Sequence, residues 1–131
     1  MKKCFVLLFS MIVLAACQRD LCAHRQELME KSLYFQFDSD EIQSKDIADL
    51  TEGAKFLTDH RFRRVHLDGF ADEQGGRDSE YNKELSYRRA QKVKDFLVEH
   101  GVTERYITIT GNGTLSGIPN WQKRRVDVTI K

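Results

Sequence analysis

Hydrophobic and polar residues alternate with two different periods along residues 32–131. A period of two residues, typical of a strand with one buried face, occurs near the start, in the middle and twice near the end of this range. A period of three to four residues, typical of an amphipathic helix, occurs between the first three of these stretches. The pattern predicts the order β-α-β-α-β-β and an α+β fold, in which two helices pack on one face of a small mixed sheet.

The predicted strands are short. They cover residues 33–37, 65–69, 106–110 and 125–130. In the first strand Leu33, Phe35 and Phe37 alternate with polar residues, so all three are expected to face the core.

Each predicted helix carries one apolar stripe that is expected to contact the sheet. The first helix covers about residues 44–60, and the second ends before Gly101, a residue type common after helix C-termini. The stripes consist of Ile47, Leu50, Ala54 and Leu57 in the first helix and of Leu85, Val93, Phe96 and Leu97 in the second.

Two arginines interrupt these apolar faces. Arg89 lies on the stripe of the second helix, four residues after Leu85, whereas Arg88 points away from it. Arg124 follows the alternation of Val126 and therefore lies on the core face, where the last strand begins. A buried guanidinium is costly unless it is paired. Each arginine needs an anion, and the pattern leaves open whether an internal salt bridge or a ligand supplies it.

Aspartates in the loops are candidates for these anions. Asp72 follows the second strand directly, and Asp38 and Asp40 follow the first. Loops that meet at one end of a sheet, beside the start of a helix, can form a small charged pocket.

Residues 1–16 have the pattern of a secretory signal. Lys2 and Lys3 form a short basic start, and residues 5–16 are apolar except for Ser10. As a helix this apolar run spans about 18 Å, which is short of the roughly 30 Å hydrocarbon core of a bilayer. A signal sequence is therefore the favoured interpretation, and a buried helix or a membrane anchor is the alternative.

The end of this segment, Leu14-Ala15-Ala16-Cys17, resembles a bacterial lipobox. In that motif the cysteine becomes the new N-terminus and carries a diacylglyceryl group through a thioether. In Gram-negative lipoproteins the next residue sorts the protein, and Gln18 is not the aspartate that retains a lipoprotein at the inner membrane. The resemblance implies the periplasmic face of the outer membrane, with residues 17–31 as a lipidated tether and residues 32–131 as the folded domain.

Composition narrows the class of protein further. The chain has 131 residues and a mass of 15.3 kDa, which leaves room for one domain. Its 21 basic and 20 acidic residues nearly balance, which argues against a nucleic-acid partner.

After Cys4 leaves with the signal and Cys17 takes lipid, Cys22 is either an intermolecular disulfide partner or a bystander.

Several motifs resemble the OmpA-like C-terminal domain family. The opening motif is Phe35-Gln36-Phe37-Asp38-Ser39-Asp40, and the closing one is Lys123-Arg124-Arg125-Val126. The central signature consists of Gly69-Phe70-Ala71-Asp72-Glu73-Gln74-Gly75, Tyr81-Asn82, Leu85-Ser86, Arg88-Arg89-Ala90 and Val93. With the lipobox, these motifs are most similar to those of the peptidoglycan-associated lipoproteins. The resemblance implies a β-α-β-α-β-α-β sandwich over residues 32–131, although the short segment 111–123 leaves the third family helix in doubt.

The resemblance also implies a ligand, the meso-diaminopimelate of the peptide stem of peptidoglycan. The free end of this residue carries one ammonium and one carboxylate on the same carbon. Asp72 matches the aspartate that receives the ammonium, and Arg89 matches the arginine that binds the carboxylate. Asn82, Asp40 and Arg124 match positions that line the same pocket.

Two residues beside these positions depart from the family pattern. Phe70 stands where a histidine is usual, and Lys123 stands where an asparagine is usual.

The leading hypothesis is an outer-membrane lipoprotein that binds peptidoglycan without catalysis and tethers the membrane to the cell wall. The alternative is a wall-anchoring subunit of an envelope machine, such as a secretion or motor complex, with a dedicated protein partner. No metal, cofactor or catalytic centre is predicted, because the histidines have no metal-ligand spacing and no nucleophile motif is present. These histidines are His24, His60, His66 and His100.

Overall fold

The computed structural model describes residues 19–21, 23–24, 26–27, 30–61, 63–73 and 78–131. Four strands form one sheet in the order β1-β4-β2-β3. β4 is antiparallel to both β1 and β2, whereas β2 and β3 are parallel, so the sheet is mixed. The strands are β1 (Ser32–Tyr34), β2 (Val65–Ala71), β3 (Ile107–Thr114) and β4 (Arg125–Ile130). The predicted signal sequence, Cys17 and Cys22 lie outside the described residues.

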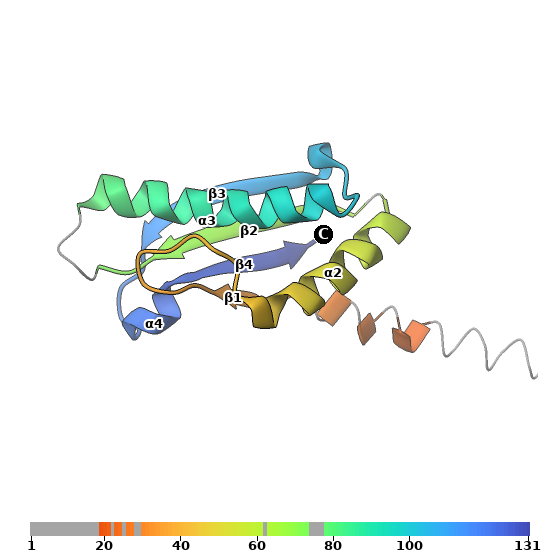
Figure 1. Cartoon of the computed structure of the whole chain (residues 1–131), viewed down its shortest axis with the longest axis horizontal. Coiled ribbons are helices and arrows are strands. Elements are labelled where there is room, and N and C mark those ends of the chain that lie inside the picture. The colour runs from red at the N-terminus through yellow and green to blue at the C-terminus, as the bar shows by residue number, and fades with distance from the viewer. Residues whose placement is uncertain (1–18, 22, 25, 28–29, 62, 74–77) are drawn as a thin grey trace, which may run out of the picture.

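Two long helices, α2 (Ser44–Asp59) and α3 (Ser79–Glu99), cover the same face of this sheet (Figure 1). The predicted α+β arrangement is therefore confirmed. A 3-10 turn (Glu104–Tyr106) precedes β3, and a one-turn helix α4 (Asn120–Lys123) precedes β4, so a short third helix is present in the segment that looked too short for one. Among the described residues, none of the helices is both long and apolar enough for a membrane span.

The core lies between the helices and the inner face of the sheet. Along β2 every second residue is buried, beginning with Val65 and ending with Ala71, as strand alternation requires. The backbones of β2 and α3 approach closely at Gly69, where an added Cβ would lie 1.9 Å from the carbonyl oxygen of Ser86. This contact fixes α3 over the end of β2 and so places Arg89, one turn later, near the residues that follow β2.

The first strand is shorter than predicted. β1 ends at Tyr34, and Leu33 and Phe35 are buried while Phe37 is 49% exposed. The strand pattern fails at Phe37 because the chain turns after Phe35, and Asp38 adopts a positive φ of 52°. The segment 35–40 therefore forms a loop at the end of the sheet instead of a longer strand.

The first helix buries Leu50, Ala54 and Leu57 as predicted, but not Ile47. Ile47 is 38% exposed, whereas Asp46 is buried. The buried line on α2 runs through Asp46, Leu50, Gly53 and Leu57, which are spaced by three or four residues. The prediction that Ile47 faces the core is wrong, because this line lies to one side of it.

Candidate functional site

The end of β2 and the start of β4 bring an aspartate and an arginine together. Asp72 follows β2 directly and Arg124 precedes β4 directly. Because these strands are antiparallel, with Gly69 opposite Val126, both residues come to the same sheet end. Nη1 of Arg124 donates to Oδ2 of Asp72 at 2.7 Å, and the two side chains are 16% and 5% exposed. The internal salt bridge, one of the two alternatives for Arg124, is present.

Arg124 also holds the loop that follows β1. Its Nε donates to the carbonyl oxygen of Phe35 at 3.2 Å, and its own carbonyl oxygen accepts from the Phe35 amide at 2.7 Å. The guanidinium therefore joins the end of β2, the start of β4 and the loop 35–40.

Arg89 is bound by backbone carbonyls and is 0% exposed. Its guanidinium donates to Ser39 O at 2.8 Å, to Phe70 O at 2.9 Å and to Gln36 O at 3.1 Å. It also lies 5.4 Å from the ring centroid of Phe35. These bonds connect α3 to the loop 35–40 and to β2, so Arg89 holds the loop in place at this end of the sheet.

Burial lowers the pKa of Arg89 to about 10. Desolvation is the largest cause, and the Arg124 charge also lowers the pKa, whereas Asp72 and Asp40 raise it. Arg89 therefore remains protonated at neutral pH and adds positive charge below the Asp72–Arg124 pair.

Asn82 lies on the same buried line of α3 as Arg89, two turns earlier. The residue is 3% exposed. Among the described residues no buried side-chain nitrogen or oxygen lacks a hydrogen-bond partner. An amide offers both donors and an acceptor, so Asn82 has the chemistry to bind a polar ligand.

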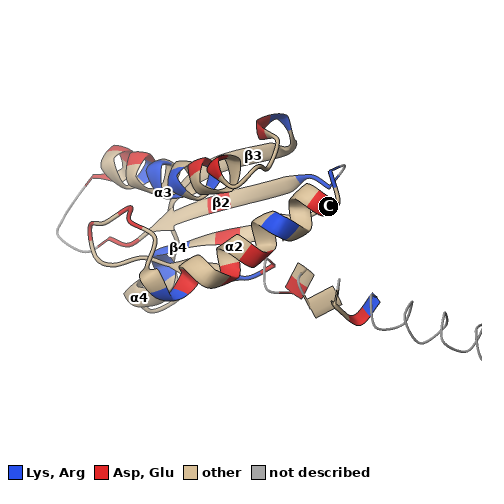
Figure 2. Ribbon diagram, turned by 45° about the vertical axis from the view of Figure 1, so that its right-hand side comes forward, with Lys and Arg blue, Asp and Glu red and all other residues tan. Residues whose placement is uncertain are grey.

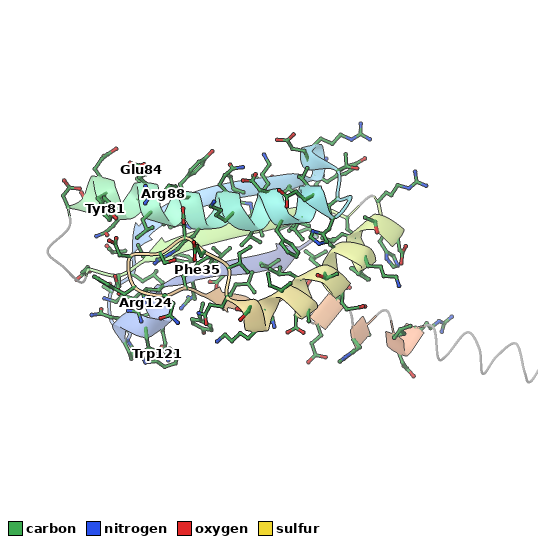
Figure 3. All side chains as sticks on the ribbon, in the orientation of Figure 1. Phe35, Tyr81, Glu84, Arg88, Trp121 and Arg124 are labelled. Carbon is green, nitrogen blue, oxygen red and sulfur yellow. The ribbon has the colours of Figure 1, made fainter. Side chains whose placement is uncertain are left out.

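Asp40 lies on the rim, where its Oδ2 is 3.5 Å from Nε of Arg88. Arg88 also donates to Glu84 at 2.9 Å and lies 5.9 Å from the ring centroid of Tyr81. The prediction that Arg88 points away from the buried stripe is correct, but its contact with Asp40 places it beside the candidate site. Figure 3 shows Tyr81, Glu84 and Arg88 on one side of Phe35, and Arg124 with Trp121 on the other.

The structure adds the surroundings of Lys123, noted above as a departure from the family pattern, and three backbone carbonyl groups that the sequence did not indicate. Lys123 is 6% exposed, and its Nζ lies 3.9 Å from Oε1 of Glu73, the residue that follows Asp72. The carbonyl groups of Gln36, Ser39 and Phe70 bind Arg89, and no side-chain pattern signals them.

Phe70, which departs from the family pattern, faces the other side of the sheet. Its ring centroid lies 5.3 Å from Cζ of Arg125, while its carbonyl oxygen accepts from Arg89. Its contribution to the pocket is therefore made by the backbone. Among the described residues, no cluster of three or more histidine, cysteine or acidic side chains could hold a metal ion.

Comparison with known proteins identifies the family. Residues 34–126 match the OmpA family, a range that includes Asp40, Asp72, Asn82, Arg89 and Arg124. The chain belongs to the OmpA family. This confirms the resemblance inferred from the motifs.

Individual relatives carry one recurring name. A peptidoglycan-associated lipoprotein of Buchnera aphidicola is 29% identical over 92 residues, which are 70% of this chain and 52% of the relative. One from Brucella melitensis is 34% identical over 104 residues, 75% of this chain and 61% of the relative. The chain thus spans only half to three fifths of these relatives. The crystal structure of the peptidoglycan-associated lipoprotein from Burkholderia pseudomallei superposes with a TM-score of 0.71 at 32% identity, covering 77% of this chain and 90% of that one.

Proposed function

We propose that this OmpA-family protein binds the diaminopimelate stem of peptidoglycan through the pocket formed by Asp72, Arg124, Asn82, Asp40 and Arg89. The observation that carries the proposal is the ion pair between Asp72 and Arg124, which is held at 2.7 Å at the end of the sheet. Family membership and the names of the relatives support peptidoglycan as the ligand.

An ion pair of this kind is matched to a zwitterion. The free end of diaminopimelate has an ammonium and a carboxylate on one carbon, so its two charges can insert between Asp72 and Arg124. Each protein charge then exchanges one partner for another, and neither is left uncompensated. Because charged hydrogen bonds are the stronger ones, a ligand that supplies both is favoured over one that supplies only one.

In this proposal Asp72 receives the ammonium, and the exposed part of Arg124 is the first cation available to the carboxylate. Arg89 is a positioning residue, because its guanidinium is 0% exposed and bound to three carbonyl groups. The family-derived role of Arg89 in binding the carboxylate stays a prediction, and it requires a shift of the loop 35–40. Asn82 and Asp40 complete the polar wall.

The test is co-sedimentation of the full chain with purified sacculi that contain meso-diaminopimelate. We expect the protein to pellet with the sacculi and to be displaced by soluble diaminopimelate muropeptides. We expect no muropeptides to be released during incubation, because the proposed function is binding without catalysis. A chain that stays in the supernatant at all sacculus concentrations would contradict the proposal.

The proposed location is the periplasmic face of the outer membrane, with Cys17 as the lipidated residue. The support is the lipobox at residues 14–17 and the recurring name lipoprotein among the relatives. We expect Cys17→Ser to weaken membrane partitioning, because the serine hydroxyl cannot form the thioether and only the apolar segment 5–16 remains to hold the membrane. The measurement is fractionation of cells that express each form. Membrane association unchanged by the substitution would contradict lipidation at Cys17.

A further inference from the structure

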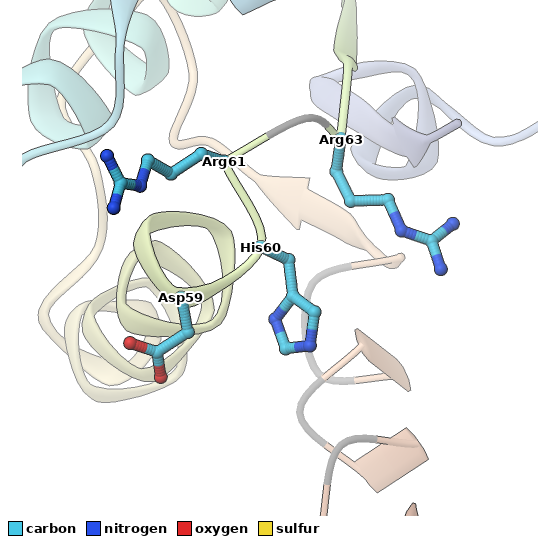
Figure 4. A pocket seen from close by; sticks show the side chains of 4 residues that line it. All are labelled: Asp59, His60, Arg61 and Arg63. Atoms are coloured by element: carbon cyan, nitrogen blue, oxygen red, sulfur yellow. The ribbon is translucent and has the colours of Figure 1, made fainter.

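Three exposed arginines gather at the end of the domain opposite the candidate site. Arg61, Arg63 and Arg64 lie between α2 and β2. Arg64 and Lys131 exchange backbone hydrogen bonds at 3.0 and 2.8 Å, which brings Lys131 to the same end. We call these four residues the basic pole. Figure 4 shows Arg61 and Arg63 extending in different directions around a surface hollow that Asp59 and His60 also line.

The side chains of these arginines are exposed, and the part that Arg63 and Arg64 play in the fold is made by their backbone. Among the described residues, no carboxylate forms an ion pair with Arg61, Arg63 or Arg64, whereas Arg124 and Arg125 are each paired with an aspartate. Asp59 is the acidic residue that lines the hollow, so positive charge prevails at the pole. Exposed basic residues at one end of a domain produce a positive potential that attracts an anionic surface.

The pole and the candidate site lie at opposite ends of β2. Arg64 precedes this strand and Asp72 follows it, and seven residues of strand separate the two ends by roughly 23 Å. Both sets of charges are visible on the ribbon in Figure 2. A molecule that binds the wall at one end therefore presents the arginines at the other.

The chain enters the domain from the side of the pole. β1 is antiparallel to β4, so the start of β1 points toward the end of β4, where Lys131 lies. The carbonyl of Lys31 accepts from the Val128 amide, and the Lys31 ammonium pairs with Asp49 on α2, which fixes this entry. In Figure 1 the described residues before β1 run toward the same end of the molecule. A membrane anchor at the N-terminus would hold this end toward the bilayer.

We propose that the basic pole docks on anionic lipid headgroups of the membrane that holds the N-terminus, and so directs the peptidoglycan pocket away from it. The proposal rests on the proposed membrane anchoring. The chemistry is the attraction of guanidinium groups to phosphate, and a membrane is favoured because the chain approaches the pole from its N-terminal side. Each basic residue near an anionic surface contributes about fivefold in affinity, so three arginines together contribute about a hundredfold.

The test compares vesicles of pure phosphatidylcholine with vesicles that contain three tenths phosphatidylglycerol. The protein is the full chain with Cys17→Ser, so that no lipid anchor contributes. Lys2, Lys3 and the apolar segment 5–16 are the same in every variant, so a difference between variants reports on the substituted residues. We expect stronger co-sedimentation with the anionic vesicles, and a preference that weakens as salt is raised. Changing Arg61, Arg63 and Arg64 together to glutamine is expected to reduce this preference by about a hundredfold.

The matched control changes Lys45, Lys83 and Lys92 to glutamine, because these exposed lysines lie away from the pole and carry the same total charge. This lysine variant is expected to keep most of the preference for anionic vesicles. Equal loss in both variants, or no preference in the parent, would overturn the proposal. Displacement by inorganic phosphate at constant ionic strength would also overturn it, because it would indicate a site for free phosphate.

Sacculus binding, measured in parallel, separates this proposal from the proposed function. The arginine variant is expected to pellet with sacculi like the parent. Failure of every variant to pellet would contradict peptidoglycan binding and leave the vesicle result standing. Loss of pelleting in the arginine variant alone would overturn the assignment of two separate surfaces.

Discussion

Replacing Arg89 with methionine is expected to lower the free energy of unfolding by about 3–5 kcal/mol. The guanidinium is 0% exposed, and its loss leaves the carbonyl groups of Gln36, Ser39 and Phe70 without their donor. Each unsatisfied buried carbonyl costs about 1–3 kcal/mol, and part of this cost is recovered when the loop 35–40 opens to water. The measurement is urea denaturation of the full chain, followed by circular dichroism.

The control is Arg88→Met on the same helix, because it removes the same charge from a neighbouring position. Arg88 is 39% exposed and pairs with Glu84 on the surface, so a loss of less than about 1 kcal/mol is expected. Similar unfolding midpoints for the two variants would show that Arg89 does not support the pocket. The expected instability also means that Arg89 variants are a poor test of ligand binding, which is better tested at Asp72.

Replacing Asp72 with asparagine is expected to weaken binding to diaminopimelate-containing sacculi by about ten- to a hundredfold. The substitution keeps the shape of the side chain but removes the charge proposed to receive the ligand ammonium. It also removes the carboxylate that now pairs with Arg124 at 2.7 Å. Loss of a charged hydrogen bond costs about 1.5–3 kcal/mol, which corresponds to the stated range of affinity. The measurement is the sacculus concentration at which half of the protein pellets.

Asp95→Asn is the matched control, since it makes the same chemical change on the exposed side of α3, near the end of the helix away from Asn82. Asp95 accepts a hydrogen bond from Gln91 on the same helix and lines a surface hollow with Asp40, on the outer side of α3 and away from the buried Asp72–Arg124 ion pair. We expect its sacculus binding to equal that of the parent. If Asp72→Asn also bound like the parent, the ion pair would be structural and the assigned role of Asp72 would be wrong.

The fold follows closely from the sequence pattern where alternation reflects burial. The strands at 65–71 and 125–130 and the helix α3 were predictable because their apolar residues recur at the spacing that places them on one face. Phe37 was predicted wrongly because alternation continues past Tyr34, although β1 pairs with β4 over only three residues. Local pattern does not report where a neighbouring strand ends.

The side chains of the candidate site could be identified from the sequence, but the backbone groups that bind them could not. A guanidinium on an apolar face needs a partner, and this requirement singles out Arg89 and Arg124 in the sequence. The pattern left open which partner each would take. Arg124 has a carboxylate and Arg89 has three carbonyls, a difference set by the path of the loop 35–40. That path depends on tertiary contacts and has no local signature.

The most direct test of the central claim is to compare binding of the unmodified chain to two wall types. A stem with lysine in place of diaminopimelate keeps the ammonium for Asp72 but has no carboxylate beside it. Binding to lysine-type sacculi is therefore expected to be about ten- to a hundredfold weaker than binding to diaminopimelate-type sacculi. Equal binding to both wall types would contradict recognition of the diaminopimelate zwitterion by this pocket.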